Sequence, residues 1–208
     1  MDFFEKARHY DIILGSQSPR RKALLADTGL PFRSLVRRIP EAFPDGMPPH
    51  EVAGFLCLEK ARPFHSERKD PSVILITADT IVVNRGKILN KPANQEEAFR
   101  MLRLLSGKWH KVMTGVCICH DGKEMVFVDT TGVCFRELAD WEIRHYINEC
   151  QPYDKAGAYG IQEWIGQVGI KQIRGSWSNV VGLPVERVFT ALKDIIVPDP
   201  QGEPTFFP

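Results

Sequence analysis

Two long strand-like segments joined by a tight turn constrain the fold of this chain most. Residues 111–119 and 123–135 are rich in β-branched and aromatic side chains, and His120-Asp121-Gly122 separates them. Asp-Gly between two such segments is a strong hairpin signal, because both residues tolerate the positive φ angles that a two-residue turn requires. The sequence therefore predicts long antiparallel strands as one component of the fold.

Helices and further strands are predicted on both sides of this hairpin. Residues 12–14 indicate a short buried strand, and 73–83 indicate a central strand that Thr77-Ala78-Asp79-Thr80 interrupts. Apolar spacing and capping residues predict helices over 19–27, 51–61, 94–105, 140–149 and 184–193, and a last strand over 165–173. This mixture predicts an α/β fold with a substantial antiparallel part.

Length, charge and hydropathy limit the domain organisation and the kinds of partner that we expect. A chain of 208 residues is long enough for one large domain or two small lobes around a shared cleft, and we expect one unit over 1–197 with a Pro-rich tail over 198–208. The net charge of +1 lacks the broad positive surface on which non-specific nucleic-acid binding relies. No apolar run approaches the roughly 18 residues of a membrane span, and the N-terminus lacks the features of a secretory signal. We therefore expect a cytoplasmic protein with no nucleic-acid or membrane partner.

The five cysteines do not form a disulfide or metal-binding pattern. Their number is odd, their spacing contains no Cys-x-x-Cys, and a chain of this length needs no disulfide scaffold. We expect reduced, mostly buried thiols. Cys117 and Cys119 would share one face of a strand, so a soft metal bound with outside ligands is the minor alternative.

The segment Gly15-Ser16-Gln17-Ser18-Pro19-Arg20-Arg21-Lys22 places three cations in the first turn of a predicted helix. A helix N-terminus already carries partial positive charge, so these cations are unfavourable unless an anion binds there. Phosphate is the natural candidate. The alternative is that Ser18 only caps the helix, Pro19 occupies its first position and the arginines extend into water.

A second unusual residue is Asp79, an acid at the end of the buried run 73–76. A buried carboxylate is costly unless it is paired or holds a cation, so Asp79 is a candidate to bind a metal or activate water, with Glu41 and Glu59 as further acids. The alternative is that Asp79 caps a turn. Lys60, Lys91 and His110 carry no signal beyond that of surface or loop residues. Gln162, in a glycine-rich segment, has an amide that can donate and accept toward the edge of a base.

Taken together, these segments resemble the Maf family of nucleoside triphosphate pyrophosphatases from residue 12 to about residue 190. The matching motifs are Ser16-Gln17-Ser18-Pro19-Arg20-Arg21, Glu41, Glu59-Lys60-Ala61, Ala78-Asp79-Thr80, Lys91-Pro92, Ser106-Gly107 with His110, Val112 and Thr114, Asp154-Lys155-Ala156-Gly157, Tyr159-Gly160-Ile161-Gln162, and Asn179-Val180-Val181-Gly182-Leu183-Pro184. Each motif is short, but their joint order and spacing are specific.

The resemblance implies a mixed, strongly twisted sheet with flanking helices, and two lobes around a nucleotide-binding cleft. It implies hydrolysis of a nucleoside triphosphate between the α and β phosphates. The divalent cation for this reaction would be Mg2+, with Mn2+ and Co2+ as alternatives. By the same resemblance, Asp79 would accept the proton of the attacking water and, with Glu41, hold the metal. The residues that would bind the triphosphate are Ser16, Ser18, Arg21, Lys60 and Lys91.

Within the family, the motifs around Asp79 and Gln162 are similar to the branch that acts on dTTP and UTP. Arg20, Thr80 and Gln162 would then set base specificity, and modified pyrimidine triphosphates would also fit. The alternatives are a pyrophosphatase for 7-methyl-GTP or another nucleotide, and a non-catalytic regulator of septum formation. A homodimer is a family expectation. Two residues depart from the family pattern: Pro40, where an aspartate is usual, and Glu163, where glycine is common.

Overall fold

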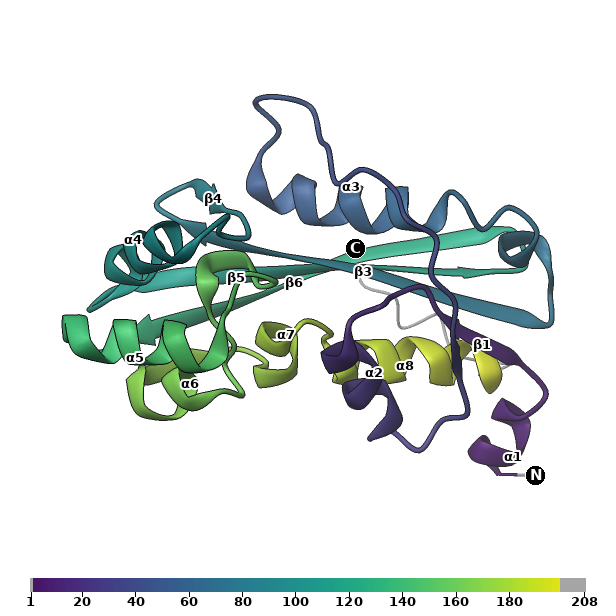
Figure 1. The fold of residues 1–208 in the computed structure, drawn as a ribbon. Helices are drawn as coiled ribbons and strands as arrows, with labels where there is room; N and C mark the ends of the chain where they lie inside the picture. Colours follow the sequence, from purple (N-terminus) through teal and green to yellow (C-terminus); the bar gives the residue numbers. More distant parts are fainter. Residues whose placement is uncertain (1, 199–208) are drawn as a thin grey trace.

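The computed structural model describes residues 2–198, which form a mixed α/β fold (Figure 1). The helices are α1 (Phe3–Ala7), α2 (Pro19–Ala26), α3 (Pro49–Ala61), α4 (Gln95–Leu105), α5 (Asp140–Cys150), α6 (Trp164–Gly169), α7 (Trp177–Val181) and α8 (Val185–Ile196), with the 3-10 turns η1 (Glu67–Lys69) and η2 (Ala156–Ala158). The strands are β1 (Asp11–Leu14), β2 (Arg33–Ser34), β3 (Val73–Asn84), β4 (Lys87–Leu89), β5 (Trp109–His120), β6 (Lys123–Phe135) and β7 (Ile170–Arg174). The predicted α/β class is confirmed.

In the described part of the chain, the strands form one seven-stranded sheet in the order β2-β1-β3-β5-β6-β7, with β4 paired to β3. β1 runs parallel to β2 and β3, and the remaining pairs are antiparallel. The predicted hairpin is β5–β6, and its turn residues Asp121 and Gly122 have φ angles of 49° and 73°. These positive angles are what the Asp-Gly signal anticipates.

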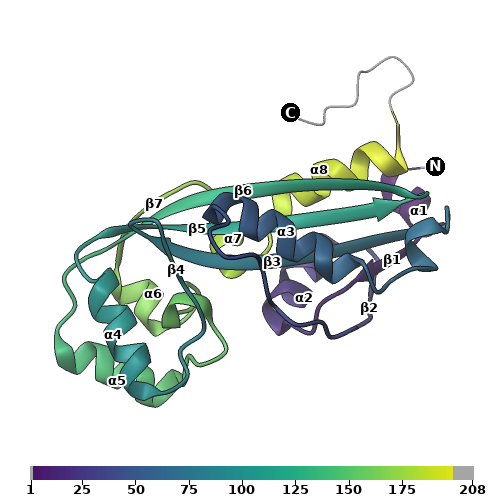
Figure 2. The same cartoon turned by 90° about the horizontal axis from the view of Figure 1, so that it is seen from above.

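The helices cover the sheet unequally. α3 lies across one face, over β3 and β5, whereas α2, α7 and α8 lie on the other face (Figure 1). Seen from above, α4, α5 and α6 gather at one end of the long strands, and α1, α2 and α8 lie toward the other (Figure 2). The long strands β3, β5 and β6 run between these two groups of helices, so one sheet supports both.

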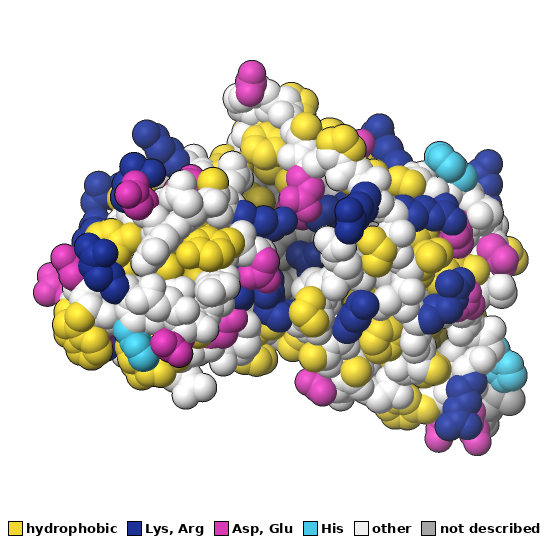
Figure 3. All heavy atoms as spheres, viewed as in Figure 1, with side chains coloured by type: hydrophobic (Ala, Val, Ile, Leu, Met, Phe, Trp, Pro, Cys, Tyr) yellow, Lys and Arg dark blue, Asp and Glu magenta, His cyan; other side chains and the backbone are white. Residues whose placement is uncertain are grey.

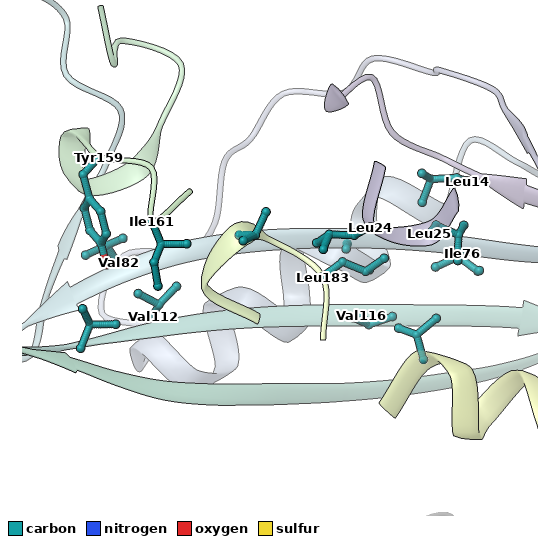
Figure 4. Close-up of a cluster of buried hydrophobic side chains, with 14 of the residues drawn as sticks. Leu14, Leu24, Leu25, Ile76, Val82, Val112, Val116, Tyr159, Ile161 and Leu183 are labelled. Atoms are coloured by element: carbon teal, nitrogen blue, oxygen red, sulfur yellow. The ribbon is translucent and has the colours of Figure 1, made fainter. Parts of the chain in front are cut away.

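The largest core cluster lies on the face opposite α3. It includes residues that Figure 4 labels along this face, from Leu14, Leu24 and Ile76 to Val112 and Ile161. Two smaller clusters fill the space between α3 and the sheet, and Cys57 and Cys117 are buried in one of them. Side chains packed on both faces of the sheet explain why β3 is buried along nearly its whole length.

The outer edge of β3 is open over residues 77–81. β1 pairs with β3 as far as Leu14 opposite Ile76, and β4 begins at Val82 opposite Leu89. Between these points, no strand of the described residues covers that edge, and we call this gap the notch. The N–H of Gly15 donates to the carbonyl of Ile76 at 2.8 Å, so the chain turns away from the sheet there. The carboxyl end of a parallel strand is a common place for a ligand site in open α/β sheets.

Two predictions about strands are wrong. β3 is not interrupted at 77–80, because Thr77 Oγ1 donates to the carbonyl of Cys57 at 2.7 Å and the polar residues continue the strand. Asp79 therefore lies within β3, neither at the end of a buried run nor capping a turn. The strand predicted over 165–173 is wrong only in its first part, since residues 165–169 belong to α6 whereas 170–173 lie in β7. The buried residues of α6 are Ile165, Gly166 and Gly169, which is helical and not alternating spacing.

The predicted helices are present with small shifts at their ends, and Ser18 and Asn94 are N-caps as expected. α1, β2, β4 and α7 were not predicted, since each is five residues long or shorter. The predicted boundary between the domain (1–197) and the Pro-rich tail (198–208) stays a prediction. Residues 199–208 of that tail lie outside the described residues.

Candidate functional site

Four predicted site residues meet at the notch, and we call them the charged cluster: Glu41, Lys60, Asp79 and Lys91. Lys60 Nζ donates to Glu41 Oε1 at 2.8 Å and also to Asp79 Oδ1, while Lys91 Nζ donates to Glu41 Oε2 at 3.1 Å. These residues come from the loop before α3, from α3, from β3 and from the segment after β4. Four separate segments thus bring two acids and two cations together.

The lysines control the ionisation of Glu41. Partial burial acts to raise the pKa of Glu41, but hydrogen bonds and positive charge from Lys60 and Lys91 outweigh it and lower this pKa to about 2. Glu41 is therefore a carboxylate at any physiological pH. Asp79 is more enclosed, with 7% of its surface exposed.

The carboxylates of Glu41 and Asp79 fit a divalent cation. Both approach the same ammonium group of Lys60, so two oxygens from separate segments already converge on one positively charged atom. Mg2+ is commonly held by one or two carboxylates with phosphate oxygens and water completing the shell. Residues 2–198 contain no cluster of three or more His, Cys, Asp or Glu able to hold a metal, and Glu41 and Asp79 are the two carboxylates that would hold a cation here.

The turn after β1 and the first turn of α2 border the notch. Ser16 Oγ accepts from the Ser18 N–H at 3.2 Å, and Ser18 Oγ accepts from the Arg21 N–H at 3.4 Å, so Ser18 is the helix cap. The arginines do not extend into water. Arg21 is half-buried, and its guanidinium donates to the Gly182 carbonyl at 2.7 Å and to Thr80 Oγ1 at 3.0 Å. Burial lowers the pKa of Arg21, with the charge of Asp79 acting in the opposite direction.

Thr80 connects α2 to the centre of the sheet. Its hydroxyl lies 2.9 Å from that of Thr114 on β5, and Thr114 Oγ1 donates to the Asn179 carbonyl at 3.0 Å. Asn179 Nδ2 in turn donates to Thr131 Oγ1 at 2.9 Å. The Arg21 side chain is therefore held by a chain of hydrogen bonds that extends across three strands.

Arg20 points to the other group of helices. Its Nη1 donates to Asp154 Oδ2 at 2.9 Å, and Lys155 Nζ donates to Asp154 Oδ1 at 2.7 Å. Burial acts to raise the pKa of Asp154, but the hydrogen bonds from Lys155 and Arg20 outweigh it and lower this pKa. Lys155 also pairs with Glu163 at 3.0 Å, and Gln162 Nε2 lies 3.5 Å from Glu163 Oε1. A continuous polar network thus links Arg20 with Gln162.

The surface is hollowed between the two groups of helices. Figure 3 shows Lys and Arg side chains together with Asp and Glu side chains around this hollow, below α3 and beside α2. Cations from both groups therefore face a shared opening, which is the arrangement needed to hold a multiply charged anion between them.

Two other residues considered in the sequence analysis, His110 and Glu59, make contacts away from the charged cluster. His110 is buried, its Nε2 lies 2.7 Å from the Tyr159 hydroxyl, and burial lowers its pKa to about 4. Glu59 pairs with Arg62 at 2.9 Å, outside the charged cluster. All five cysteines are free thiols, and Cys117 Sγ and Cys119 Sγ lie 3.5 Å apart on one face of β5, as their spacing predicted.

The sequence did not assign roles to several residues that hold the site together. Asp154 and Lys155 stand in a motif that was recognised, yet nothing in their spacing indicates an ion pair with Arg20, which is 134 positions away from Asp154. Tyr146 has no sequence signal at all, and it donates to Glu163 and accepts from the Gly160 N–H at 3.0 Å. Such contacts depend on the fold and not on local pattern.

Comparison with known proteins gives a consistent result. A family model described as Maf-like protein matches residues 11–195. A protein of Porphyromonas gingivalis named dTTP/UTP pyrophosphatase is 46% identical over 192 residues, covering 91% of this chain and 96% of the relative. Proteins of the same name from Cytophaga hutchinsonii and Phocaeicola vulgatus are 46% and 45% identical, covering 95% and 92% of this chain and 89% and 99% of the relatives. Among the described residues, no helix combines the length and apolar character needed to cross a bilayer.

Proposed function

Because this chain belongs to the Maf family, we propose that it is a nucleoside triphosphate pyrophosphatase that hydrolyses dTTP and UTP to the monophosphate and pyrophosphate. The observation that carries this proposal is the charged cluster, in which Glu41, Lys60, Asp79 and Lys91 meet at the notch. The relatives named dTTP/UTP pyrophosphatase, which are similar over nearly the whole chain, support the choice of substrate.

The cations around the notch bind the triphosphate. Lys60 and Lys91 both pair with the Glu41 carboxylate. Arg21 is held in place by its hydrogen bonds to Thr80 and Gly182. Fixed positive charge is most useful where negative charge grows in the transition state, which here is the leaving pyrophosphate. The Ser16 and Ser18 segment adds hydroxyl and backbone contacts at the start of α2.

Glu41 and Asp79 hold the divalent cation that the reaction requires, with Mg2+ as the expected ion and Mn2+ or Co2+ as substitutes. A bound cation neutralises charge on the phosphate oxygens. Lys60, which pairs with both carboxylates, would supply positive charge to a phosphate. Pro40 has no side-chain atom that could bind a metal, so we assign the metal to Glu41 and Asp79.

Asp79 accepts the proton of the water that attacks the α phosphorus. The side chain is mostly enclosed and lies within the long strand β3. A base on a packed strand is held in a defined orientation, which favours in-line attack. The proton moves from water to Asp79 as the α–β phosphoanhydride bond breaks and pyrophosphate leaves.

Arg20, Thr80 and Gln162 surround the nucleoside end of the site and set base preference. The network from Arg20 through Asp154, Lys155 and Glu163 to Gln162 supports a shared role for Arg20 and Gln162. Modified pyrimidine triphosphates that keep the same base edge are substrates as well. The protein would remove such nucleotides from the nucleotide pool of the cytoplasm. Its activity would also link it to septum formation.

The protein acts as a homodimer built from one domain per chain, without nucleic-acid or membrane partners. A single-domain organisation is supported by the largest core cluster, which joins residues from both groups of helices, such as Leu24 and Ile143. Light scattering on the purified protein tests the dimer. A mass of one chain would contradict it.

The proposed function is tested by measuring pyrophosphate release from dTTP, UTP, CTP, GTP and 7-methyl-GTP in the presence of Mg2+. Preference for dTTP and UTP is the expected result. Preference for 7-methyl-GTP would agree with the proposed reaction but would contradict the proposed preference for dTTP and UTP. No release from any nucleotide, with binding retained, would favour the non-catalytic regulator.

A further inference from the structure

Glu163 is the centre of a group of hydrogen bonds beside Gln162. Glu163 Oε1 accepts from Lys155 Nζ at 3.0 Å, and Glu163 Oε2 accepts from the Tyr146 hydroxyl. The Glu163 side chain is only 22% exposed, and each of its carboxylate oxygens has a partner from another segment. Three of its neighbours, Lys155, Tyr146 and Gln162, come from different segments.

The backbone around Glu163 is shaped to bring this carboxylate against Gln162. A Cβ at Gly160 would lie 2.7 Å from Gln162 Nε2 and 2.8 Å from Glu163 Cδ, so the two side chains fold back over Gly160 and would have to shift to make room for a larger residue. The Gly160 N–H donates to the Tyr146 hydroxyl, which itself donates to Glu163. Loop and carboxylate are therefore fixed by the same tyrosine.

This arrangement determines which way the Gln162 amide points. Gln162 Nε2 lies 3.5 Å from Glu163 Oε1, with the donor facing the acceptor. The reversed amide would place its oxygen beside a carboxylate oxygen, and two acceptors repel each other. Gln162 Oε1 is buried and has no hydrogen-bond partner among the described residues. A buried acceptor without a partner is costly, and a ligand that donates to it recovers that cost.

We propose that Glu163 is a positioning residue for base selection: it holds Gln162 Nε2 and leaves Oε1 as the acceptor offered to the nucleobase. The site then selects bases that present a ring N–H donor. Uracil and thymine carry such a donor at N3, whereas N3 of cytosine is an acceptor and would face Gln162 Oε1 without a proton between them. This inference rests on the proposed function, because it assumes that Gln162 meets the base.

The test compares UTP with CTP in Glu163→Gln, a variant of nearly the same shape. A glutamine at 163 can accept from or donate to Gln162, so either orientation of the Gln162 amide becomes acceptable. We expect the ratio of kcat/KM for UTP over CTP to fall about tenfold, the size expected for one buried hydrogen bond. The change should come mainly through KM. Glu163→Asp, which keeps the carboxylate, should retain more of the ratio, and Glu149→Gln on the exposed face of α5 should leave it unchanged.

Binding gives a second readout that does not depend on turnover. Calorimetry with α,β-imido analogues of UTP and CTP should show the same loss of discrimination in Glu163→Gln. An unchanged ratio in both assays, or equal losses for both nucleotides with a lower melting temperature, would show that Glu163 only stabilises the loop and would overturn the inference. Absence of UTP hydrolysis by the unmodified protein would instead contradict the proposed function, while the binding ratio would still test Glu163.

Discussion

Asp79 in β3 lies directly opposite Gly115 in β5, at the point where α3 rests on the sheet. A Cβ at Gly115 would collide with the backbone carbonyl of Ala53 in α3. This close approach of helix and strand brings Lys60, in the last turn of α3, to the Asp79 carboxylate. The absence of a side chain at one residue of β5 thus sets the distance between a helix and the candidate base.

Gly115→Ala should therefore destabilise the protein and disturb the site. The added methyl group has no room against a backbone carbonyl, and overpacking of this kind costs about 1–3 kcal/mol. The free energy of unfolding by urea measures this change, and UTP turnover should fall as α3 is displaced from Asp79.

Gly54→Ala is the matched control at the same interface. A Cβ at Gly54 makes ordinary contact with Val128, 3.4 Å away, and alanine is favoured over glycine within a helix by up to about 1 kcal/mol. We expect equal or greater stability for Gly54→Ala. Equal destabilisation by both substitutions would contradict the close packing at Gly115.

Buried His110 should make the protein less stable in mild acid. Its pKa is lowered by burial from 6.5 to about 4, so the unfolded chain binds a proton more readily than the folded chain between these pH values. Stability should be unaffected by this residue above pH 6.5 and should fall by about 3 kcal/mol as the pH drops from 6.5 to 4. Urea unfolding at a series of pH values measures the slope.

His110→Gln should remove most of that pH dependence while keeping a hydrogen-bonding group for Tyr159. The exposed residue His9 is the control, and His9→Gln should leave the slope unchanged. If the slope between pH 6.5 and 4 survives in His110→Gln, other groups cause it.

Lys91 should contribute to binding of the triphosphate. Lys91→Met removes a charged partner from Glu41 and a cation from the notch. Hydrogen bonds to charged groups contribute about 1.5–3 kcal/mol, so kcat/KM for UTP should fall at least about tenfold. Lys87→Met, on the exposed end of β4, should change it little. Equal losses in the two variants would indicate a general effect of surface charge.

The sequence predicted the parts of the fold that local pattern controls. The Asp121-Gly122 turn, the Asn94 cap and the spacing of α3 are local, and all three are confirmed. The error at Thr77–Thr80 has a tertiary cause, since Thr77 is satisfied by the Cys57 carbonyl on another element. The helix α6 was missed because two of its three buried residues are glycines, which contribute no apolar signal.

The candidate site was predicted as a set of residues but not as an arrangement. The resemblance to the Maf family implied that Glu41, Lys60, Asp79 and Lys91 belong to one site, yet the shared position of Lys60 between two carboxylates follows from the packing of α3 on the sheet. Arg21 was expected at a phosphate, and its hydrogen bonds to Thr80 and Gly182 were not foreseen. Long-range contacts of this kind have no counterpart in sequence spacing.

The most direct test of the account is the products formed from UTP with Mg2+ by the unmodified protein and by Asp79→Asn. Asparagine keeps the shape of the side chain and loses the proton acceptor, so we expect UMP and pyrophosphate from the unmodified protein and a loss of about a hundredfold or more in the variant. The melting temperature shows that the variant is folded. Formation of UDP and phosphate, or equal turnover by a folded Asp79→Asn, would contradict the account.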